Sequence, residues 1–271
     1  MKTESWVEIR YQDRKYRLAT FGGQDIVNRS YQKGHFYEEA LLTKIAQIAR
    51  SGIYLDVGSH IGNHTLFFAK ECLSTLVIGF EPWKPPYRLS LLTIKANGIT
   101  GKVRLFNLPV SEKDGMPVSY FSPAGHQNTG SGYIQISETD RAVVFDDTVA
   151  RLVNMFSLSS SKRKTDTGHS EKGLKIRSVS IDGIVSRLDE AEPIALLKID
   201  VEGSEMQVLS GAKLTIQRWQ PVVVVETKTN ADRSQIDQIM IEQNHYVWKG
   251  QYCATPTQLY MPEDKNLRKR S

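Results

Sequence analysis

Short apolar runs alternate with helically spaced apolar residues along most of the chain. Runs typical of buried strands occupy residues 53–57, 76–80, 103–106, 194–199, 222–225 and 246–248. Stretches with the 3.6-residue period of an amphipathic helix occupy residues 37–48, 63–69, 87–97, 204–218 and 234–244. Because continuous apolar strands separated by helices are typical of parallel sheets covered on both faces, the pattern predicts an open, doubly wound α/β domain.

The N-terminal twenty residues follow a different, two-residue alternation of apolar and polar positions. Apolar positions on both sides of a polar turn at 12–15 predict a β-hairpin. We therefore divide the chain into a hairpin with its lead-in, residues 1–36, and a main domain, residues 37–271.

Residues 112–178 interrupt the alternation of strands and helices. Within this insertion, 133–136 and 141–145 are typical of short strands, whereas 157–173 is polar and of low complexity. We expect 157–173 to be mobile because it has too few apolar side chains to pack. A strand at 174–181 is predicted to lead back into the core.

Composition excludes several classes of protein. The 271 residues are 40% hydrophobic and 24% charged, enough to form a core without disulfides or a structural metal. The two cysteines, Cys72 and Cys253, are too far apart in sequence for a redox motif. Since no apolar run approaches the roughly 20 residues of a spanning helix and the N-terminus lacks a secretory signal, we expect a cytoplasmic protein with no membrane partner.

The net charge of +5 comes largely from two polar stretches, 162–164 and 265–270. A surface that stacks single-stranded nucleic acid interleaves aromatic and basic residues, and these stretches do not. We interpret the second stretch as a solvated tail and do not expect a nucleic-acid partner.

The densest group of candidate ligand residues follows the first predicted parallel strand. Asp56 ends the strand, and Gly58 and Gly62 follow it before a helix begins. Ligands of doubly wound sheets bind at such turns. Glycine lets the main chain approach a ligand, and a helix N-terminus favours a carboxylate. The alternative is that Asp56 only caps the helix.

Glu81 ends the next predicted strand, 25 residues after Asp56. A carboxylate there can accept both hydroxyls of a ribose, which indicates an adenosine-type ligand. A dinucleotide requires glycine at the first, third and sixth positions of the turn, but the third and sixth are His60 and Asn63. S-adenosyl-L-methionine fits better, since it has no pyrophosphate and its ammonium group would pair with Asp56. The alternative is that Glu81 is a surface acid.

A third charged group surrounds the end of the predicted strand 194–199. Its charged members are Lys198, Asp200, Glu202 and Glu205. Charges at the end of a buried strand cost desolvation energy unless they meet partners or substrate, so their density favours a site. The alternative is that Asp200 or Ser204 caps the next helix and Glu205 complements its dipole.

Three motifs together resemble the FkbM family of S-adenosylmethionine-dependent methyltransferases. They are Asp-Val-Gly-Ser-His-Ile-Gly-Asn-His-Thr at 56–65, Gly-Phe-Glu-Pro at 79–82, and Lys-Ile-Asp-Val-Glu-Gly-Ser-Glu at 198–205, continued by Val-Leu-Ser-Gly-Ala at 208–212. The resemblance spans residues 37–226. It implies a class I methyltransferase (Rossmann-like) fold whose seven-stranded sheet has an antiparallel last strand. It also implies methylation of a hydroxyl on a sugar, polyketide or other small molecule.

The predicted cofactor site combines the motif residues with two positions that the resemblance supplies. Its members are Glu38, Asp56, Gly58, Ser59, Gly62, Asn63, Thr65, Glu81 and Ser111. The resemblance implies that Glu38 lies near the methionine end of the cofactor and Ser111 near the adenine. The chain departs from the family in Ser59, where alanine is commoner, and in the polar stretch 157–173, which leaves the acceptor open.

Methyl transfer from a sulfonium is an in-line displacement, so catalysis consists of positioning and removal of the acceptor's proton. Asp200 is predicted to lie nearest the acceptor hydroxyl, with Glu202 second. Lys198 would lower the pKa of a nearby acid or pair with it structurally. Alternative bases are His60, His64 and His126. Asp200 with a second acid would suit an oxygen-bound cation, but no ligand spacing requires one, so no metal is predicted.

Two other functions are left open by the residues. One is a nicotinamide-dependent oxidoreductase, and the other is a non-catalytic adenosyl- or RNA-binding module supported by the basic tail. A small-molecule acceptor is the expected partner of the enzyme. The hairpin and the insertion also offer edges through which a homodimer would pair.

Overall fold

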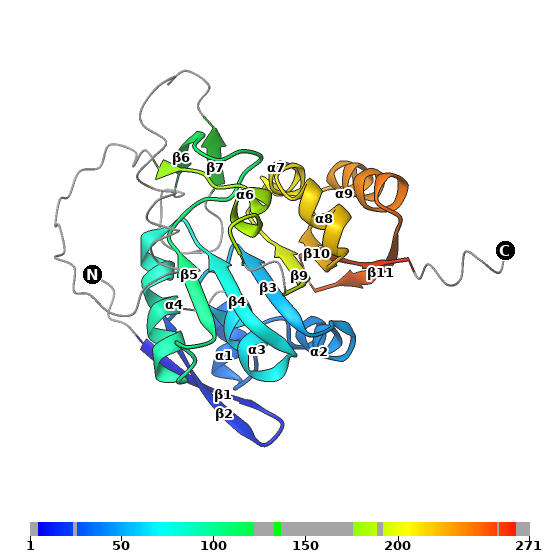
Figure 1. Cartoon of the computed structure of the whole chain (residues 1–271). Coiled ribbons are helices and arrows are strands. Elements are labelled where there is room, and N and C mark those ends of the chain that lie inside the picture. Colours follow the sequence, from blue (N-terminus) through cyan, green and yellow to red (C-terminus); the bar gives the residue numbers. More distant parts are fainter. Residues whose placement is uncertain are drawn as a thin grey trace.

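The computed structural model describes residues 5–23, 26–121, 133–136, 176–188, 192–253 and 255–263. Seven strands form one sheet in the order β11-β12-β10-β9-β3-β4-β5 (Figure 1). Their bounds are β3 Gly52–Val57, β4 Ser74–Phe80, β5 Val103–Phe106, β9 Ile194–Ile199, β10 Val222–Glu226, β11 Tyr246–Tyr252 and β12 Thr257–Pro262. Neighbours from β10 to β5 are parallel, whereas β12 is antiparallel to both β10 and β11. The predicted class I methyltransferase sheet with an antiparallel last strand is confirmed.

Helices cover the two faces of this sheet (Figure 1). The first face carries α1 Ile26–Gln32, α2 Glu39–Ile48, α3 Asn63–Glu71 and α4 Lys84–Ala96. The second carries α6 Ile181–Val185, α7 Glu205–Ser210, α8 Lys213–Trp219, α9 Asn230–Asp237 and the π-helix η1 Gln238–Gln243. Within the described ranges, every helix is too short or too polar to cross a bilayer.

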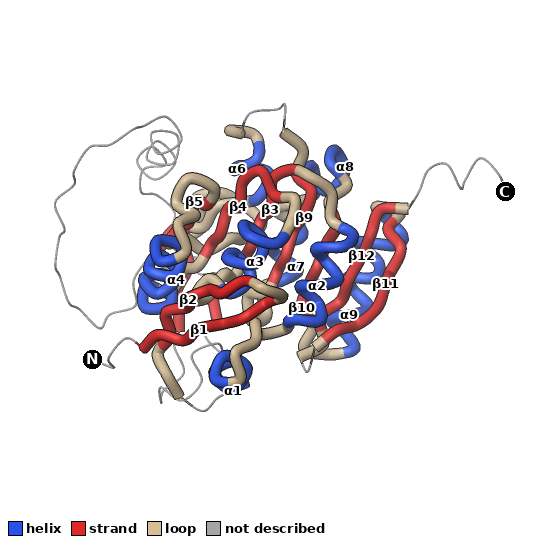
Figure 2. The backbone as a smooth tube through the Cα atoms, turned by 90° about the horizontal axis from the view of Figure 1, so that it is seen from below, coloured by secondary structure: helices blue, strands red, loops and turns tan. Residues whose placement is uncertain are grey.

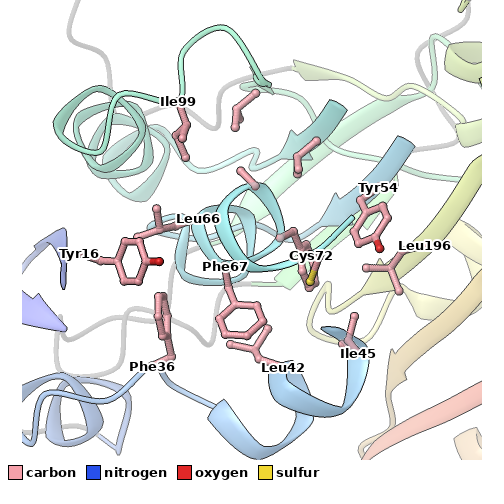
Figure 3. Close-up of a cluster of buried hydrophobic side chains, with 14 of the residues drawn as sticks. Tyr16, Phe36, Leu42, Ile45, Tyr54, Leu66, Phe67, Cys72, Ile99 and Leu196 are labelled. Atoms are coloured by element: carbon pink, nitrogen blue, oxygen red, sulfur yellow. The ribbon is translucent and has the colours of Figure 1, made fainter. Parts of the chain in front are cut away.

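Each strand supplies side chains to two separate cores, because successive residues of a strand point to opposite faces. Tyr54 of β3 belongs to the buried cluster on the first face, together with Leu42 and Phe67 (Figure 3). Its neighbour Leu55 belongs to the cluster on the second face, together with Val208. This alternation also decides on which face each polar residue at the strand ends lies.

The N-terminal hairpin consists of β1 Ser5–Tyr11 and β2 Arg14–Thr20, as predicted. Its residues Ile9 and Leu18 have no exposed surface and belong to the first-face core. The backbone N–H of Ala19 donates to the hydroxyl of Thr93 on α4 at 3.1 Å. The hairpin therefore packs beside α4 (Figure 2); the boundary between residues 1–36 and 37–271 stays a prediction.

The predicted single helix over 204–218 is wrong, because α7 and α8 are separated at Gly211. A Cβ on Gly211 would overlap the carbonyl oxygen of Ser111, and its own carbonyl accepts the N–H of Asp182 at 2.8 Å. Of the predicted strand over 174–181, residues 174 and 175 lie outside the described part of the chain, and Ile176–Arg177 form β8. The strand ends earlier than predicted, because α6 begins after Ser180, whose hydroxyl accepts the N–H of Gly183.

Part of the insertion forms a small separate sheet. Its strands are β6 Pro117–Phe121, β7 Tyr133–Ile136 and β8, in the order β7-β6-β8. The strand predicted at 133–136 is confirmed as β7. The predicted strand at 141–145, the stretch 157–173 and the candidate base His126 lie outside the described residues.

Candidate functional site

Acidic residues meet on one face at the carboxyl ends of four neighbouring strands. Asp56 of β3 pairs in register with Lys198 of β9 on one side and Gly79 of β4 on the other. Glu81 lies two residues beyond Gly79, and Asp200 two residues beyond Lys198. Since side chains two residues apart share a face, these groups converge on the side covered by α2, α3 and α4.

The turn after β3 has the conformation that its glycines predict. Gly58 has a φ of +80° and a Cβ there would overlap the carbonyl oxygen of Asp200. Gly62 has a φ of +88°, and its Cβ would lie 2.6 Å from the hydroxyl of Ser90. The N–H groups of Gly58 and Ser59 both donate to the carbonyl of Phe80 at 2.9 Å. Glycine is therefore needed here to let the turn lie against β4 and the end of β9.

Asp56 lies beneath this turn and has no exposed surface. Its Oδ2 accepts the hydroxyl of Thr65 at 2.5 Å, and its Oδ1 is 3.3 Å from the Nζ of Lys198. Gly79 leaves room for this group, since a Cβ there would lie 3.3 Å from the hydroxyl of Thr65. Asp56 was predicted to contact a ligand's ammonium group directly, but its carboxylate has no exposed surface in this structure. The carboxylate instead links the turn to β9 through Lys198.

Lys198 connects the turn to the carboxylates around it. Its Nζ donates to the carbonyl of Gly58 at 2.8 Å and lies 3.4 Å from the Oδ2 of Asp200. Burial alone would lower the pKa of Lys198, but Asp200, Asp56 and Glu38 raise it above its usual value. The ammonium group is therefore a permanent positive charge, and its predicted pairing with a nearby acid is observed.

Glu81 is held by backbone donors on both of its oxygens. Oε2 accepts the N–H of His60 at 2.9 Å, and Oε1 accepts the N–H of Trp83 at 2.8 Å. Burial is the main influence on this carboxyl and raises its pKa to about 7, although the two N–H donors act in the opposite direction. A carboxylate has about four acceptor positions, so two remain for other donors.

The first turn of α3 fixes the segment ahead of β3. The side-chain amide of Asn63 donates to the carbonyl of Tyr37 at 3.0 Å, and its oxygen accepts the N–H of Tyr37 at 3.1 Å. His64 Nε2 lies 3.1 Å from Glu38 Oε2, and both side chains are buried. The structure thus brings Glu38 beside the first turn of α3 and pairs it with His64, whose alternative role as base stays a prediction.

A cluster of three carboxylates lies at the ends of β9 and β10. Asp200, Glu202 and Glu226 each place one carboxylate oxygen within 4.8 Å of the others. Burial raises the pKa of Glu226 to about 9, and the negative charges of Asp200 and Glu202 add to this shift. Burial would also raise the pKa of Asp200, but Lys198 reverses the effect and lowers it overall. The predicted catalytic residues Asp200 and Glu202 therefore lie beside Glu226, which the sequence analysis did not single out.

Glu226 was detectable by the signal that identified the other acids. It ends the apolar strand 222–225, just as Asp56, Glu81 and Asp200 end or follow theirs. Its role could not be inferred from sequence because the order of strands in the sheet determines which acids are neighbours.

Three other residues named in the sequence analysis lie at turns and loops around the site. Glu205 Oε1 accepts the N–H of Gly203 at 2.9 Å and that of Val201 at 3.3 Å, which closes the turn before α7. Ser204 occupies the N-cap position of α7 but its side chain forms no capping hydrogen bond, whereas Glu205 lies in the first turn of α7, as the alternative predicted. The N–H of Ser111 donates to Val179 at 2.9 Å, while its buried hydroxyl has no hydrogen-bond partner in the described part of the chain.

Comparison with known proteins relates this chain to methyltransferases. A family model described as the methyltransferase FkbM domain matches residues 56–248. The methyltransferase sdnD of Sordaria araneosa is 23% identical over 235 residues, covering 80% of this chain and 82% of that protein. The crystal structure of methyltransferase FkbM from Methylobacillus flagellatus KT is 16% identical with a TM-score of 0.49, covering 80% of this chain. This chain spans only 45% of that protein. Because the family model matches well over half of the chain, from the glycine turn into β11, the protein belongs to the FkbM methyltransferase family.

Proposed function

We propose that this protein is an S-adenosylmethionine-dependent O-methyltransferase acting on a hydroxyl of a small molecule. The observation that carries the proposal is the position of Glu81. Two backbone N–H groups hold its buried carboxylate beside the turn 58–62, with acceptor positions left for the two hydroxyls of a ribose. Membership of a methyltransferase family favours this cofactor over the nicotinamide alternative.

Different residues in and around the turn would bind different parts of such a ligand. Glu81 would accept the ribose hydroxyls, and the buried pair of Glu38 and His64 would lie toward the methionine end. Asp56 and Thr65 would act from below by fixing the turn. The cofactor, when bound, supplies a methyl group on a positively charged sulfur.

Asp200 is the residue best suited to receive the acceptor's proton. Lys198 lowers its pKa, so the carboxylate is ionised at neutral pH. Its side chain is 34% exposed, compared with 0% for Asp56, so an acceptor molecule can reach it. A carboxylate that orients a hydroxyl and takes its proton as the methyl group arrives is consistent with in-line displacement.

The test separates cofactor binding from turnover. Titration calorimetry with S-adenosylhomocysteine is expected to show one site per chain, weakened at least about tenfold in Glu81→Ala, since a buried hydrogen-bonding acceptor is lost. Asp200→Asn is expected to bind the ligand normally. In a turnover assay with hydroxylated acceptors, however, it is expected to form S-adenosylhomocysteine slowly. The matched control is Glu242→Gln, which removes one charge from an exposed position on η1.

Several results would contradict this proposal. They are absence of binding at millimolar S-adenosylhomocysteine, equal loss of binding in Glu81→Ala and Glu242→Gln, or full turnover in Asp200→Asn. Methylation of a nitrogen or carbon acceptor, with hydroxyl acceptors inert, would retain the cofactor and overturn the assignment of the acceptor atom.

A further inference from the structure

When all are ionised, the three carboxylates at the ends of β9 and β10 and their neighbour Asp56 have more negative charge than the surrounding lysines balance. Lys198 is shared between Asp56 and Asp200, and Lys228 lies 2.6 Å from Glu202. With Glu226 included, four carboxylates thus surround two ammonium groups. When all four acids are ionised, two negative charges have no partner among these groups. Such an imbalance is most costly at Glu226, which is buried, because the side chains of Asp200 and Glu202 keep 34% and 29% of their surface exposed.

Glu226 adds an independent observation. The residue is only 7% exposed, and no donor lies within hydrogen-bond distance of its Oε2 among the residues that the structure describes, although the carboxyl of Asp200 is close enough to share a proton with the Glu226 side chain. Its carboxylate nevertheless contributes an oxygen to the group within 4.8 Å. A buried carboxyl beside two other carboxylates is an arrangement that a divalent cation can complete in place of a shared proton.

The ligand atoms indicate which class of cation would bind. All three are carboxylate oxygens, with no imidazole or thiolate among them. Oxygen-only donor sets suit Mg²⁺, Mn²⁺ and Ca²⁺, whereas zinc and copper sites in proteins usually include nitrogen or sulfur. Mg²⁺ typically takes only one or two carboxylates and keeps several water molecules, which an acceptor's oxygen could replace.

We propose that Asp200, Glu202 and Glu226 form a binding site for a divalent cation of the Mg²⁺ or Mn²⁺ class, which would hold the acceptor's oxygen beside Asp200. The cation would lie between β9 and β10 and draw Glu202 away from Lys228. The role of the cation in holding the acceptor rests on the proposed function, but cation binding itself requires neither cofactor nor acceptor.

The experiment measures cation binding to the full chain without any methyl-transfer assay. After treatment with a chelator, titration with Mn²⁺ is followed by calorimetry and by the electron paramagnetic resonance signal of free Mn²⁺. We expect one Mn²⁺ per chain, displaced by excess Mg²⁺. Glu226→Gln and Asp200→Asn keep the size of the side chain and are each expected to weaken binding at least about tenfold. Glu242→Gln, the exposed control, is expected to stay within about twofold of the wild type.

Each outcome bears on one claim. Absence of Mn²⁺ binding at millimolar concentration, as expected if Asp200 and Glu226 merely share a proton, would overturn the inference. Unchanged binding in both cluster variants would also overturn it, and thermal unfolding of each variant confirms that it is folded. A parallel titration with S-adenosylhomocysteine in the presence of chelator separates the two proposals. Ligand binding without Mn²⁺ binding removes only the cation site, and the reverse result removes only the proposed cofactor.

Discussion

Lys198 is the residue on which the charge balance of the site depends. It is 4% exposed and lies within 3.4 Å of both Asp56 and Asp200 while donating to the carbonyl of Gly58. Its neighbours come from β3, from the end of β9 and from the glycine turn. A single ammonium group therefore compensates two carboxylates and orients the backbone between them.

Replacement of Lys198 by methionine tests this role. Because Asp56 would be left as a buried charge without its partner, Lys198→Met is expected to lower the free energy of unfolding by about 3–5 kcal/mol, measured by urea denaturation. Lys228→Met is the matched control, since the Lys228 side chain is 41% exposed and its ion pair with Glu202 is worth at most about 1 kcal/mol. Equal stability of the two variants would contradict this role.

Glu81 predicts a pH dependence of ligand binding. Its pKa is raised to about 7, so the carboxyl is mostly protonated at pH 6 and mostly ionised at pH 8. Ribose hydroxyls donate to the ionised form, so binding favours loss of the proton. The affinity for S-adenosylhomocysteine is therefore expected to rise about tenfold from pH 6 to pH 8 in calorimetric titrations. Glu81→Gln should bind more weakly, and its affinity should no longer change with pH over this range; an unchanged pH profile would assign the effect to another group.

At the scale of elements, local patterns predicted the strands well and the ends of helices poorly. The strands 103–106 and 194–199 were predicted with the bounds that β5 and β9 have. The helix over 204–218 was not, because it breaks at Gly211, whose backbone packs closely against Ser111, about one hundred residues away in sequence. The helical spacing of apolar residues continues across such a break, because the spacing shows which side chains are buried and does not show whether the backbone bends.

The glycine turn gives a prediction at this scale. Gly58 and Gly98 both have positive φ values, +80° and +65°, but a Cβ at Gly58 would overlap the backbone of Asp200 whereas a Cβ at Gly98 meets nothing within 4 Å. Gly98→Ala is expected to cost about 1–2 kcal/mol from backbone conformation alone. Gly58→Ala should cost about 1–3 kcal/mol more, because the turn must move away from β9. Thermal and urea unfolding of the pair would measure the difference, and equal costs would show that the turn is loosely packed.

At the scale of the whole molecule, the sheet separates two apolar cores and the N-terminal hairpin closes one of them (Figures 1 and 2). Ile9, Tyr16 and Leu18 of the hairpin belong to the same cluster as Phe67 of α3. Tyr16 and Phe67 are both drawn in Figure 3, on either side of Phe36. The hairpin thus contributes to the layer of packing that supports α3, whose first turn forms part of the candidate site.

Integration of the hairpin predicts a single cooperative unfolding transition. Leu18 has no exposed surface, so Leu18→Ala is expected to lower the free energy of unfolding of the entire chain by about 2–5 kcal/mol. The exposed Leu73, at 63%, provides the control, since Leu73→Ala should change stability by less than about 0.5 kcal/mol. Fluorescence and circular dichroism should report the same midpoint for Leu18→Ala. Two separated transitions would show that residues 1–36 unfold independently.

Much of the candidate site was predictable because its signals are local in sequence. Asp56, Glu81 and Asp200 each end or follow an apolar strand, and parallel strands align their carboxyl ends at one edge of the sheet. The two-residue period then indicates which acids share a face. Glu226 carries the same signal but was not singled out.

The sequence by itself determined the class of fold, the strands of the sheet and the acids at their ends, because apolar periodicity and glycine positions depend on neighbouring residues. Only the tertiary structure decided how these acids are used. Strand order places β3 between β4 and β9, and register sets Asp56 beside Lys198. Asp56 is buried beneath the turn and supports it, and Glu226 lies beside Asp200. Such contacts join residues far apart in sequence, so they arise only when the sheet is assembled.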